Sequence, residues 1–115
     1  MLIFPLKKEW YEKIRSGEKT VEYREVKPYW TRRIERYLDD CVSRLTTSQL
    51  MEELFNHGHP IKFMLSYRDC ILRLGYTKRQ MTADITKIGV VDGKDTDLRV
   101  DKPVYAIHLA NVREN

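Results

Sequence analysis

The segment Ser16–Arg24, "SGEKTVEYR", lies where a helical pattern ends and a strand begins, and it decides which folds the chain can adopt. Lys19, Glu22 and Arg24 place three charges within six residues of this segment. Charged side chains cost free energy to bury unless they are paired. The segment is therefore either an ordinary solvated strand face or a place where charges converge.

Strand alternation separates these possibilities in part. Because successive side chains point to opposite faces of a strand, Glu22 and Arg24 share one face, and we expect Val21 and Tyr23 to face the core from the other. Glu22 and Arg24 alone could be a surface ion pair, which contributes little. Lys19 joins them only if it lies in the turn before the strand. A carboxylate between two cations could then accept a base's amino hydrogen, while the cations bind phosphate or carbonyl oxygens.

Upstream of this segment the pattern is a strand followed by a helix. Leu2–Leu6 reads as a short apolar strand, and residues 7–16 read as a helix because Leu6, Trp10 and Ile14 recur every four residues. Gly17 stands where a helix-ending glycine belongs. The strand predicted over Lys19–Val26 follows directly.

Downstream of this segment the spacing of the apolar residues changes twice, first to that of helices and then back to that of strands. Pro28 opens an amphipathic helix whose apolar positions are Trp30, Ile34, Tyr37, Leu38, Cys41, Val42 and Leu45. A third helix is predicted over residues 46–58, and strands over 61–67, 81–91 and 104–112, with a polar loop over 92–102 that begins with the Asp-Gly of a tight turn. Asp69–Leu74 could be either a strand or a turn.

This order of elements predicts an α+β fold with a mostly antiparallel sheet. Five or six strands in 115 residues could curl into a small barrel, since closure removes exposed edges. The length suits a single domain, residues 1–115.

The charge of the chain is unevenly distributed. The net charge is +4, and residues 1–36 hold 10 Lys/Arg against 6 Asp/Glu, whereas the remainder holds 11 of each. A local basic surface suits a phosphate-bearing partner, although an ordinary solvated surface also fits a charge this modest.

No apolar run is long enough for a membrane span, and the start of the chain does not read as a signal peptide. Two cysteines, read as reduced thiols, favour a cytoplasmic protein.

Basic and aromatic residues flank the charged segment. Lys8, Lys27 and Arg32 could extend a binding footprint along a nucleic-acid backbone, and Tyr29 could stack on a base. Trp10 is better explained as a core residue, because it lies on the apolar stripe of its helix.

Other chemistry-bearing residues are isolated in the sequence. His57 and His59 read as loop residues and His108 as a core histidine, so we expect neither a metal site nor a cofactor. Asp84 stands between apolar neighbours in a predicted strand and needs either a cationic partner or a ligand. A hydrolase would need a carboxylate or a lysine as general base, and Lys19, Glu22 and Asp84 are the candidate catalytic residues. Asp84 near Lys19 would favour a hydrolase, whereas a partner for Asp84 elsewhere would weaken that interpretation.

The segment "LKKEWYEKIRSGEKTVEYR" resembles the ASCH domain, a branch of the PUA-like superfamily. The family motif G-x-K-x-x-E-x-R is matched by Gly17, Lys19, Glu22 and Arg24. The clear match covers roughly residues 2–36, with looser agreement over 61–112, and a helical insertion is expected at about 35–60.

The resemblance implies a small PUA-like β-barrel with flanking α-helices and a cationic cleft, lined by the motif, for RNA or a modified nucleoside. Some small members are hydrolases. One group deacetylates acetylated cytidine with a lysine, a threonine and a downstream glutamate; Lys19 matches the lysine, whereas Glu22 occupies the threonine position. Others are linked to ribonuclease activity, which could use Lys19 with Tyr23 or Tyr67.

A third alternative is a protein-interaction domain whose motif is purely structural. It predicts a closed ion-pair network with no cavity beside it.

Overall fold

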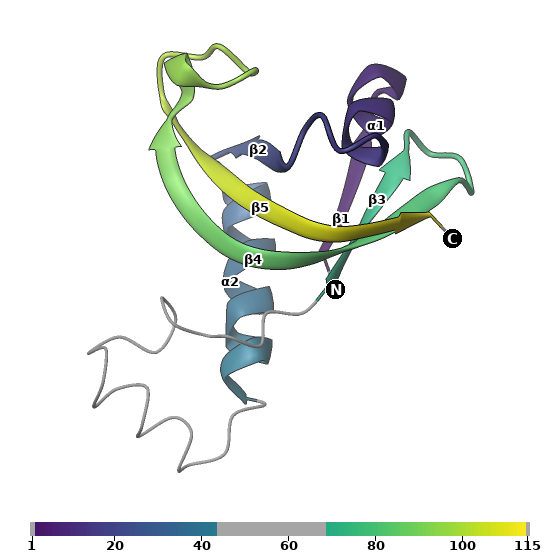
Figure 1. Ribbon diagram of the computed structural model, residues 1–115. Coiled ribbons are helices and arrows are strands. Elements are labelled where there is room, and N and C mark those ends of the chain that lie inside the picture. The colour runs from purple at the N-terminus through teal and green to yellow at the C-terminus, as the bar shows by residue number, and fades with distance from the viewer. Residues whose placement is uncertain (1, 44–68, 115) are drawn as a thin grey trace.

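The computed structural model describes residues 2–43 and 69–114, with the backbone alone for residues 41–43. The predicted third helix, the strand over 61–67, and the side chains of Cys41, His57, His59 and Tyr67 lie outside what is described. The described elements are β1 (Leu2–Leu6), α1 (Lys8–Arg15), β2 (Val21–Glu25), α2 (Pro28–Ser43), β3 (Asp69–Leu74), β4 (Gln80–Asp92), the short 3-10 helix η2 (Gly93–Asp95) and β5 (Pro103–Glu114) (Figure 1).

The strands form one five-stranded mixed sheet in the order β1-β3-β4-β5-β2. β1 pairs with β3 in parallel, and the other three pairings are antiparallel. The α+β class and the mostly antiparallel sheet are therefore confirmed, and Asp69–Leu74 is a strand. β1 and β2, which flank α1 in the sequence, are the two edges of the sheet.

The sheet curls into a half-barrel, and the hairpin of β4 and β5 forms its long curved wall (Figure 1). The register between these strands shifts twice, between Thr82 and Asp84 and between Ile85 and Lys87. Extra residues of this kind bend a strand and increase its twist. The curvature brings the two edge strands toward one another.

Apolar side chains from the sheet and both helices form one core. Phe4 of β1 stacks on Trp30 of α2 with ring centroids 5.3 Å apart, and Tyr11 and Ile14 of α1 are fully buried in the same cluster. Burying a side chain of this size contributes about 1.5–3 kcal/mol. Because Trp30, Ile34 and Tyr37 are buried, α2 presents its arginines to solvent, as its periodicity predicts.

The face of β2 that points inward differs from our expectation. Glu22 is only 5% exposed, whereas Val21 and Tyr23 are half-buried. Glu22 lies opposite Ile107 of β5, which belongs to the core cluster. The prediction that Val21 and Tyr23 face the core is therefore wrong, because the curl of the sheet places the charged face of β2 on the inside.

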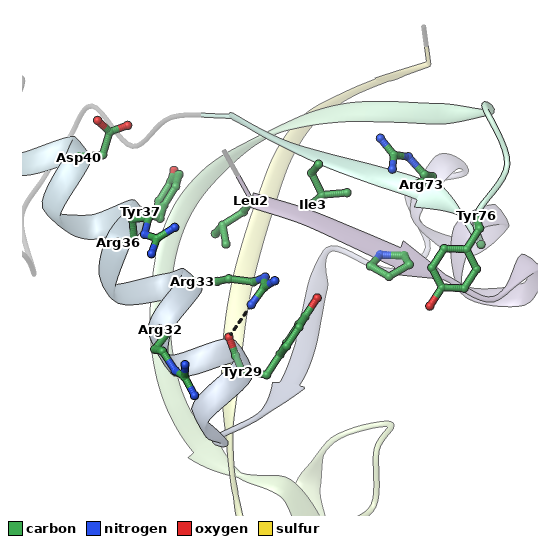
Figure 2. A pocket seen from close by; sticks show the side chains of 12 residues that line it. Leu2, Ile3, Tyr29, Arg32, Arg33, Arg36, Tyr37, Asp40, Arg73 and Tyr76 are labelled. Carbon is green, nitrogen blue, oxygen red and sulfur yellow. Dashed lines mark hydrogen bonds between the residues drawn. The ribbon is translucent and has the colours of Figure 1, made fainter.

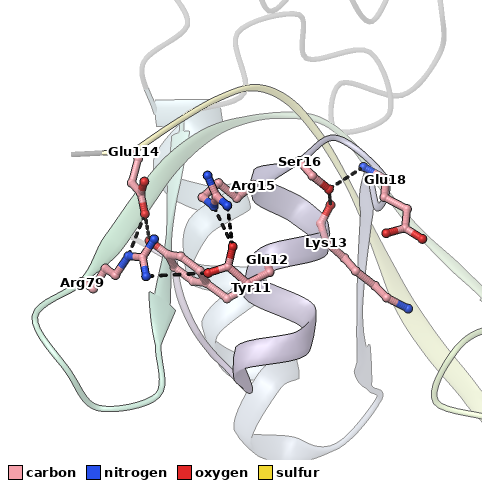
Figure 3. Close-up of polar contacts among 8 residues, drawn as sticks. All are labelled: Tyr11, Glu12, Lys13, Arg15, Ser16, Glu18, Arg79 and Glu114. Carbon is pink, nitrogen blue, oxygen red and sulfur yellow. Dashed lines mark hydrogen bonds and ion pairs between the residues drawn. The ribbon is translucent and has the colours of Figure 1, made fainter.

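A polar network attaches α1 to the end of β5 (Figure 3). The Tyr11 hydroxyl donates to Glu114 at 2.9 Å, and Arg79 donates from Nε to the same carboxylate oxygen at 2.9 Å. Burial, followed by the neighbouring Glu114 carboxylate, raises the pKa of Tyr11 to about 12. The phenol therefore stays protonated and keeps its donor role at neutral pH.

None of the helices in the described part of the chain combines the length and apolar character needed to cross a bilayer.

Candidate functional site

The turn after α1 places Lys19 ahead of the strand. Gly17 has φ +87°, a left-handed conformation that glycine adopts without steric cost. The backbone N–H of Lys19 donates to Lys13 O at 3.0 Å, and β2 begins only at Val21. Lys19 therefore lies in the turn, where its side chain is free of strand alternation and can reach the face of Glu22.

The three charged motif residues converge. Arg24 Nη2 lies 3.1 Å from Glu22 Oε2, and Lys19 Nζ lies 3.9 Å from Glu22 Oε1. Glu22 Oε1 also accepts a hydrogen bond of 2.8 Å from the backbone N–H of Tyr23. The side chains of Lys19, Glu22 and Arg24 are 9%, 7% and 18% exposed, so this is a largely buried ion-pair network rather than a solvated strand face.

A fourth member, Asp97, comes from the loop between β4 and β5. Its carboxylate accepts a hydrogen bond from Lys19 Nζ, 78 positions away in the sequence. Lys19, Glu22, Arg24 and Asp97 are called the motif cluster below. With two cations and two carboxylates, the motif cluster carries no net formal charge.

The loop that carries Asp97 is tightly folded. Instead of the predicted tight Asp-Gly turn, Gly93 begins the 3-10 helix, and its N–H donates to Lys102 O at 2.9 Å. A Cβ atom at Gly93 would lie 2.6 Å from the carbonyl oxygens of Val100 and Lys102, so only glycine fits. The buried hydroxyl of Thr96 donates to Gly93 O at 2.9 Å. These contacts hold Asp97 in place over the turn.

Sequence reasoning missed Asp97. The one available signal is composition. The first third of the chain is basic, whereas this loop carries the four acidic residues Asp92, Asp95, Asp97 and Asp101. Local periodicity carries no information on which of these carboxylates meets Lys19.

Arg24 joins the two edges of the sheet. Its Nη2 donates to Pro5 O on β1 at 2.9 Å, while the residue itself belongs to β2. The guanidinium carbon lies 5.3 Å from the ring centroid of Phe4 and 4.9 Å from that of Trp30. Arg24 Nε is buried and has no hydrogen-bond partner among the described residues.

A cavity of about 340 Å³ lies beside this network, and we call it the motif cleft. Its aromatic lining is Trp10, Tyr23 and Trp30. Its charged lining residues are Lys7, Glu22, Arg24, Glu25, Lys27 and Asp97. The motif cleft therefore combines ring faces with hydrogen-bonding groups of both signs.

Lys19 lines a neighbouring hollow of about 520 Å³. Trp10, Tyr23 and Asp97 line both that hollow and the motif cleft, so the two are adjacent. Lys19 Nζ lies 5.3 Å from the ring centroid of Trp10 and 4.8 Å from that of Tyr23, within cation–π distance. The ammonium group is thus held between two rings and two carboxylates.

The other predicted binding residues are divided between regions. Lys27 lines the motif cleft, and Gly17 shapes the turn before it. Lys8 is exposed on α1 and is not among the residues lining the cleft. Tyr29 and Arg32 line a different hollow, of about 850 Å³, between α2 and the β3–β4 turn (Figure 2).

Asp84 is not part of this site. Its carboxylate accepts hydrogen bonds from Asn111 Nδ2 at 2.8 Å and from Arg113 Nη1 at 3.3 Å. The hydrogen bond from Asn111, together with Arg113, holds the pKa of Asp84 below its ordinary value. Asp84 therefore has both of its hydrogen-bond partners on β5. Its side chain lies on the face of β4 opposite the buried Ala83 and Ile85.

His108 and Cys70 offer no chemistry at this site. His108 is half-buried rather than a core residue, because the inward face of β5 carries Ile107 and Leu109; burial and the nearby Lys87 lower its pKa. Burial raises the pKa of the Cys70 thiol to about 12, so it is a poor nucleophile. Within residues 2–43 and 69–114, no group of His, Cys, Asp or Glu side chains has the arrangement of a metal site.

Comparisons of the chain with protein-family models, with curated proteins and with solved structures found no match.

Proposed function

We propose that the chain is a PUA-like domain of the ASCH type that binds RNA by taking one unpaired base, or a modified nucleoside, into the motif cleft. The observation that carries this proposal is the pairing of an aromatic-lined cavity with a buried, mixed-charge motif cluster. The proposal of the ASCH family itself rests on the motif Gly17, Lys19, Glu22 and Arg24.

The lining of the cleft favours a base over a phosphate group. Because Glu22 and Asp97 neutralise Lys19 and Arg24, the motif cluster offers donors and acceptors side by side rather than a concentrated positive charge. A nucleobase edge presents the same mixture of donors and acceptors. Unstacked bases are commonly held between aromatic side chains, and Trp10, Tyr23 and Trp30 supply such rings.

The size and hydrogen bonding of the cleft support the same assignment. Its volume of about 340 Å³ is at the lower end of small-molecule sites, which span roughly 300–1,000 Å³. Arg24 lines the cleft with its side chain 18% exposed, so a base carbonyl or ring nitrogen can accept a hydrogen bond from the accessible part of the guanidinium.

The two tryptophans make the proposal directly testable. Trp10 and Trp30 are the only tryptophans in the chain, and both line the motif cleft. We expect nucleosides and short single-stranded RNA to quench tryptophan fluorescence in a saturable way. Lys19→Ala and Glu22→Gln should weaken this binding at least about tenfold, since each removes a charge-assisted hydrogen bond from the cluster.

The matched control is Lys87→Ala, which removes an exposed lysine that lines neither the cleft nor the adjacent hollow. It should bind as the wild type does. If nucleosides leave the tryptophan fluorescence unchanged, or if all three variants bind alike, the cleft does not hold a base.

The two alternatives make different predictions. The ion-pair network is closed, as the structural-motif alternative requires, but that alternative predicts no cavity beside it. The hydrolase alternative is weakened because Asp84 is paired with Asn111 and Arg113. Turnover of acylated nucleosides, or RNA cleavage that is abolished in Glu22→Gln, would instead support a hydrolase.

A further inference from the structure

The hollow on the other side of Pro5 differs from the motif cleft in its chemistry. It is lined by four arginines, Arg32, Arg33 and Arg36 of α2 and Arg73 of β3, together with two exposed tyrosines. We call it the arginine hollow. Pro5 lines both the arginine hollow and the motif cleft, so the two sites are adjacent.

The arginines of this hollow differ from those of the motif cluster in their partners. Within the described residues no ion pair joins any of the four to a carboxylate, although Asp40 also lines the hollow. Arg33 is held in place by Tyr29: its Nη1 donates to Tyr29 O at 3.3 Å, and its guanidinium carbon lies 3.6 Å from the ring centroid. Arg73 donates to Gln80 Oε1 at 3.4 Å.

The arginines approach the hollow from two sides (Figure 2). Arg33 and Arg36 project from α2, and Arg73 lies across β1 from them, whereas the guanidinium of Arg32 points away at the edge. Guanidinium groups bind phosphate oxygens in a planar, two-pronged geometry. An elongated anion that runs across β1 can therefore contact arginines on both sides.

Two of the three tyrosines that line the hollow are unusually exposed for aromatic side chains. Tyr76, in the β3–β4 turn, is 96% exposed, and Tyr29 is 50% exposed. Exposed aromatic rings beside cations are the combination that binds single-stranded nucleic acid, in which bases stack while phosphates are contacted by basic residues. An acidic peptide would use the arginines but would leave the ring of Tyr76 without a stacking partner, since Tyr29 already carries the Arg33 guanidinium.

We propose that the arginine hollow is a second site, which binds the phosphodiester backbone of the nucleotides that flank the base in the motif cleft. Tyr76 stacks on a base of this flanking segment, while Tyr29 holds the Arg33 guanidinium in place. The inference rests on the proposed function in one respect only, namely that the same strand occupies both sites by passing over Pro5. The cleft then selects the base, and the hollow supplies the salt-dependent part of the affinity.

The test compares a nucleoside, which lacks phosphate, with a single-stranded RNA long enough to cover both sites. The hollow variant is Arg33→Gln/Arg36→Gln/Arg73→Gln. We expect nucleoside binding, read from tryptophan quenching, to stay unchanged. RNA binding should weaken, and the slope of log affinity against log salt concentration should become shallower by about 0.7 for each phosphate that the variant no longer binds.

The charge-matched control is Arg15→Gln/Lys87→Gln/Lys94→Gln, which removes three exposed cations that line neither site. It should retain most of the wild-type slope. A hollow variant and a control with the same slope would show that only overall charge matters, and this would overturn the proposal.

A second variant, Tyr76→Ala, keeps the proposal testable if the triple variant unfolds. Because the Tyr76 ring is almost fully exposed, its removal should not change the melting temperature. Removal of one stacking ring should weaken RNA binding at least about fivefold while leaving nucleoside binding unchanged. Wild-type RNA affinity in Tyr76→Ala, or equal effects of an acidic peptide and RNA as competitors, would overturn the proposal.

Failure of this inference is distinguishable from failure of the proposed function. If nucleosides do not bind but the hollow variant still reduces the salt slope for RNA, the cleft assignment fails and the arginine hollow stands. If nucleosides bind but the hollow variant behaves as the control does, the cleft assignment stands and the arginine hollow fails.

Discussion

The motif cluster and the arginine hollow are neighbouring groups of cations that the fold treats in opposite ways. Lys19 and Arg24 are largely buried, and each is paired with a carboxylate. Arg33 and Arg36 are exposed, and neither forms an ion pair within the described parts of the chain. Burial makes an unpaired charge costly, so the cluster must neutralise itself, whereas water stabilises the arginines of the hollow and leaves them available for a partner.

The largest effect that we expect distinguishes the two regions by stability. Glu22→Ala should lower the free energy of unfolding by about 3–5 kcal/mol, because it leaves Lys19 and Arg24 largely buried without their shared carboxylate. Arg33→Ala should change it by no more than about 1 kcal/mol, because the residue is exposed and loses only a cation–π contact and a hydrogen bond with Tyr29 at the surface. Urea denaturation at neutral pH measures both values.

Glu22→Gln provides the matched control, since it keeps the shape of the side chain and one acceptor oxygen. Its free energy of unfolding should lie between those of the wild type and Glu22→Ala. If Glu22→Ala and Arg33→Ala lowered the free energy of unfolding by the same small amount, the motif cluster would be as well solvated as the hollow. The contrast between the two regions would then disappear.

A smaller effect should follow from Arg24→Lys. Lysine lacks the planar group that contacts both Glu22 and Pro5 O, so we expect the free energy of unfolding to fall by about 1–3 kcal/mol. Because Arg24 joins the edges of the sheet, the amide protons of β1 and β2 should exchange faster with deuterium. Arg73→Lys, the same change in the hollow, should leave those exchange rates unaltered, and equal acceleration in both variants would contradict the role of Arg24 as the edge contact.

The smallest expected effect concerns alkaline pH and the network at the end of β5. The pKa of Tyr11 is raised from its ordinary value of 10.0 to about 12, so the folded state holds this proton more tightly than the unfolded state does. The resulting stability is fully present below pH 10 and is lost as the pH rises toward 12. Tyr11→Phe should flatten the fall of stability over this range, whereas Arg36→Gln in the hollow should leave its steepness unchanged. Identical slopes in the wild type and Tyr11→Phe would rule out this proton as the cause.

Much of the secondary structure is predictable because it depends on local sequence. The spacing of Trp30, Ile34 and Tyr37 predicts α2 and places its arginines on the solvent face, as observed. Gly17 predicts the end of α1, since few other residues adopt its backbone conformation. Both predictions require only the geometry of a single helix.

The predicted orientation of β2 was wrong for a tertiary reason. Hydrophobicity favours Val21 and Tyr23 as the inward residues, and this would hold for a flat sheet with one solvated face. Here β2 is an edge strand of a curled sheet, and its inner face carries Arg24 beside Glu22 and meets Lys19 as well as the core. Ion pairing makes the burial of Glu22 tolerable, and hydropathy takes no account of ion pairing.

The sequence by itself determined α1 and α2, most of the described strands, the basic surplus of the first third and the motif that suggests a family. It also determined that Glu22 and Arg24 share a face, since alternation is a property of any strand. Only the tertiary structure decided that this face is buried, that Asp97 completes the motif cluster, and that Tyr29 and Arg32 belong to a separate hollow. The physical reason is that these contacts join residues brought together by the curl of the β4–β5 hairpin and the docking of α2, and neither is encoded in the spacing of neighbouring residues.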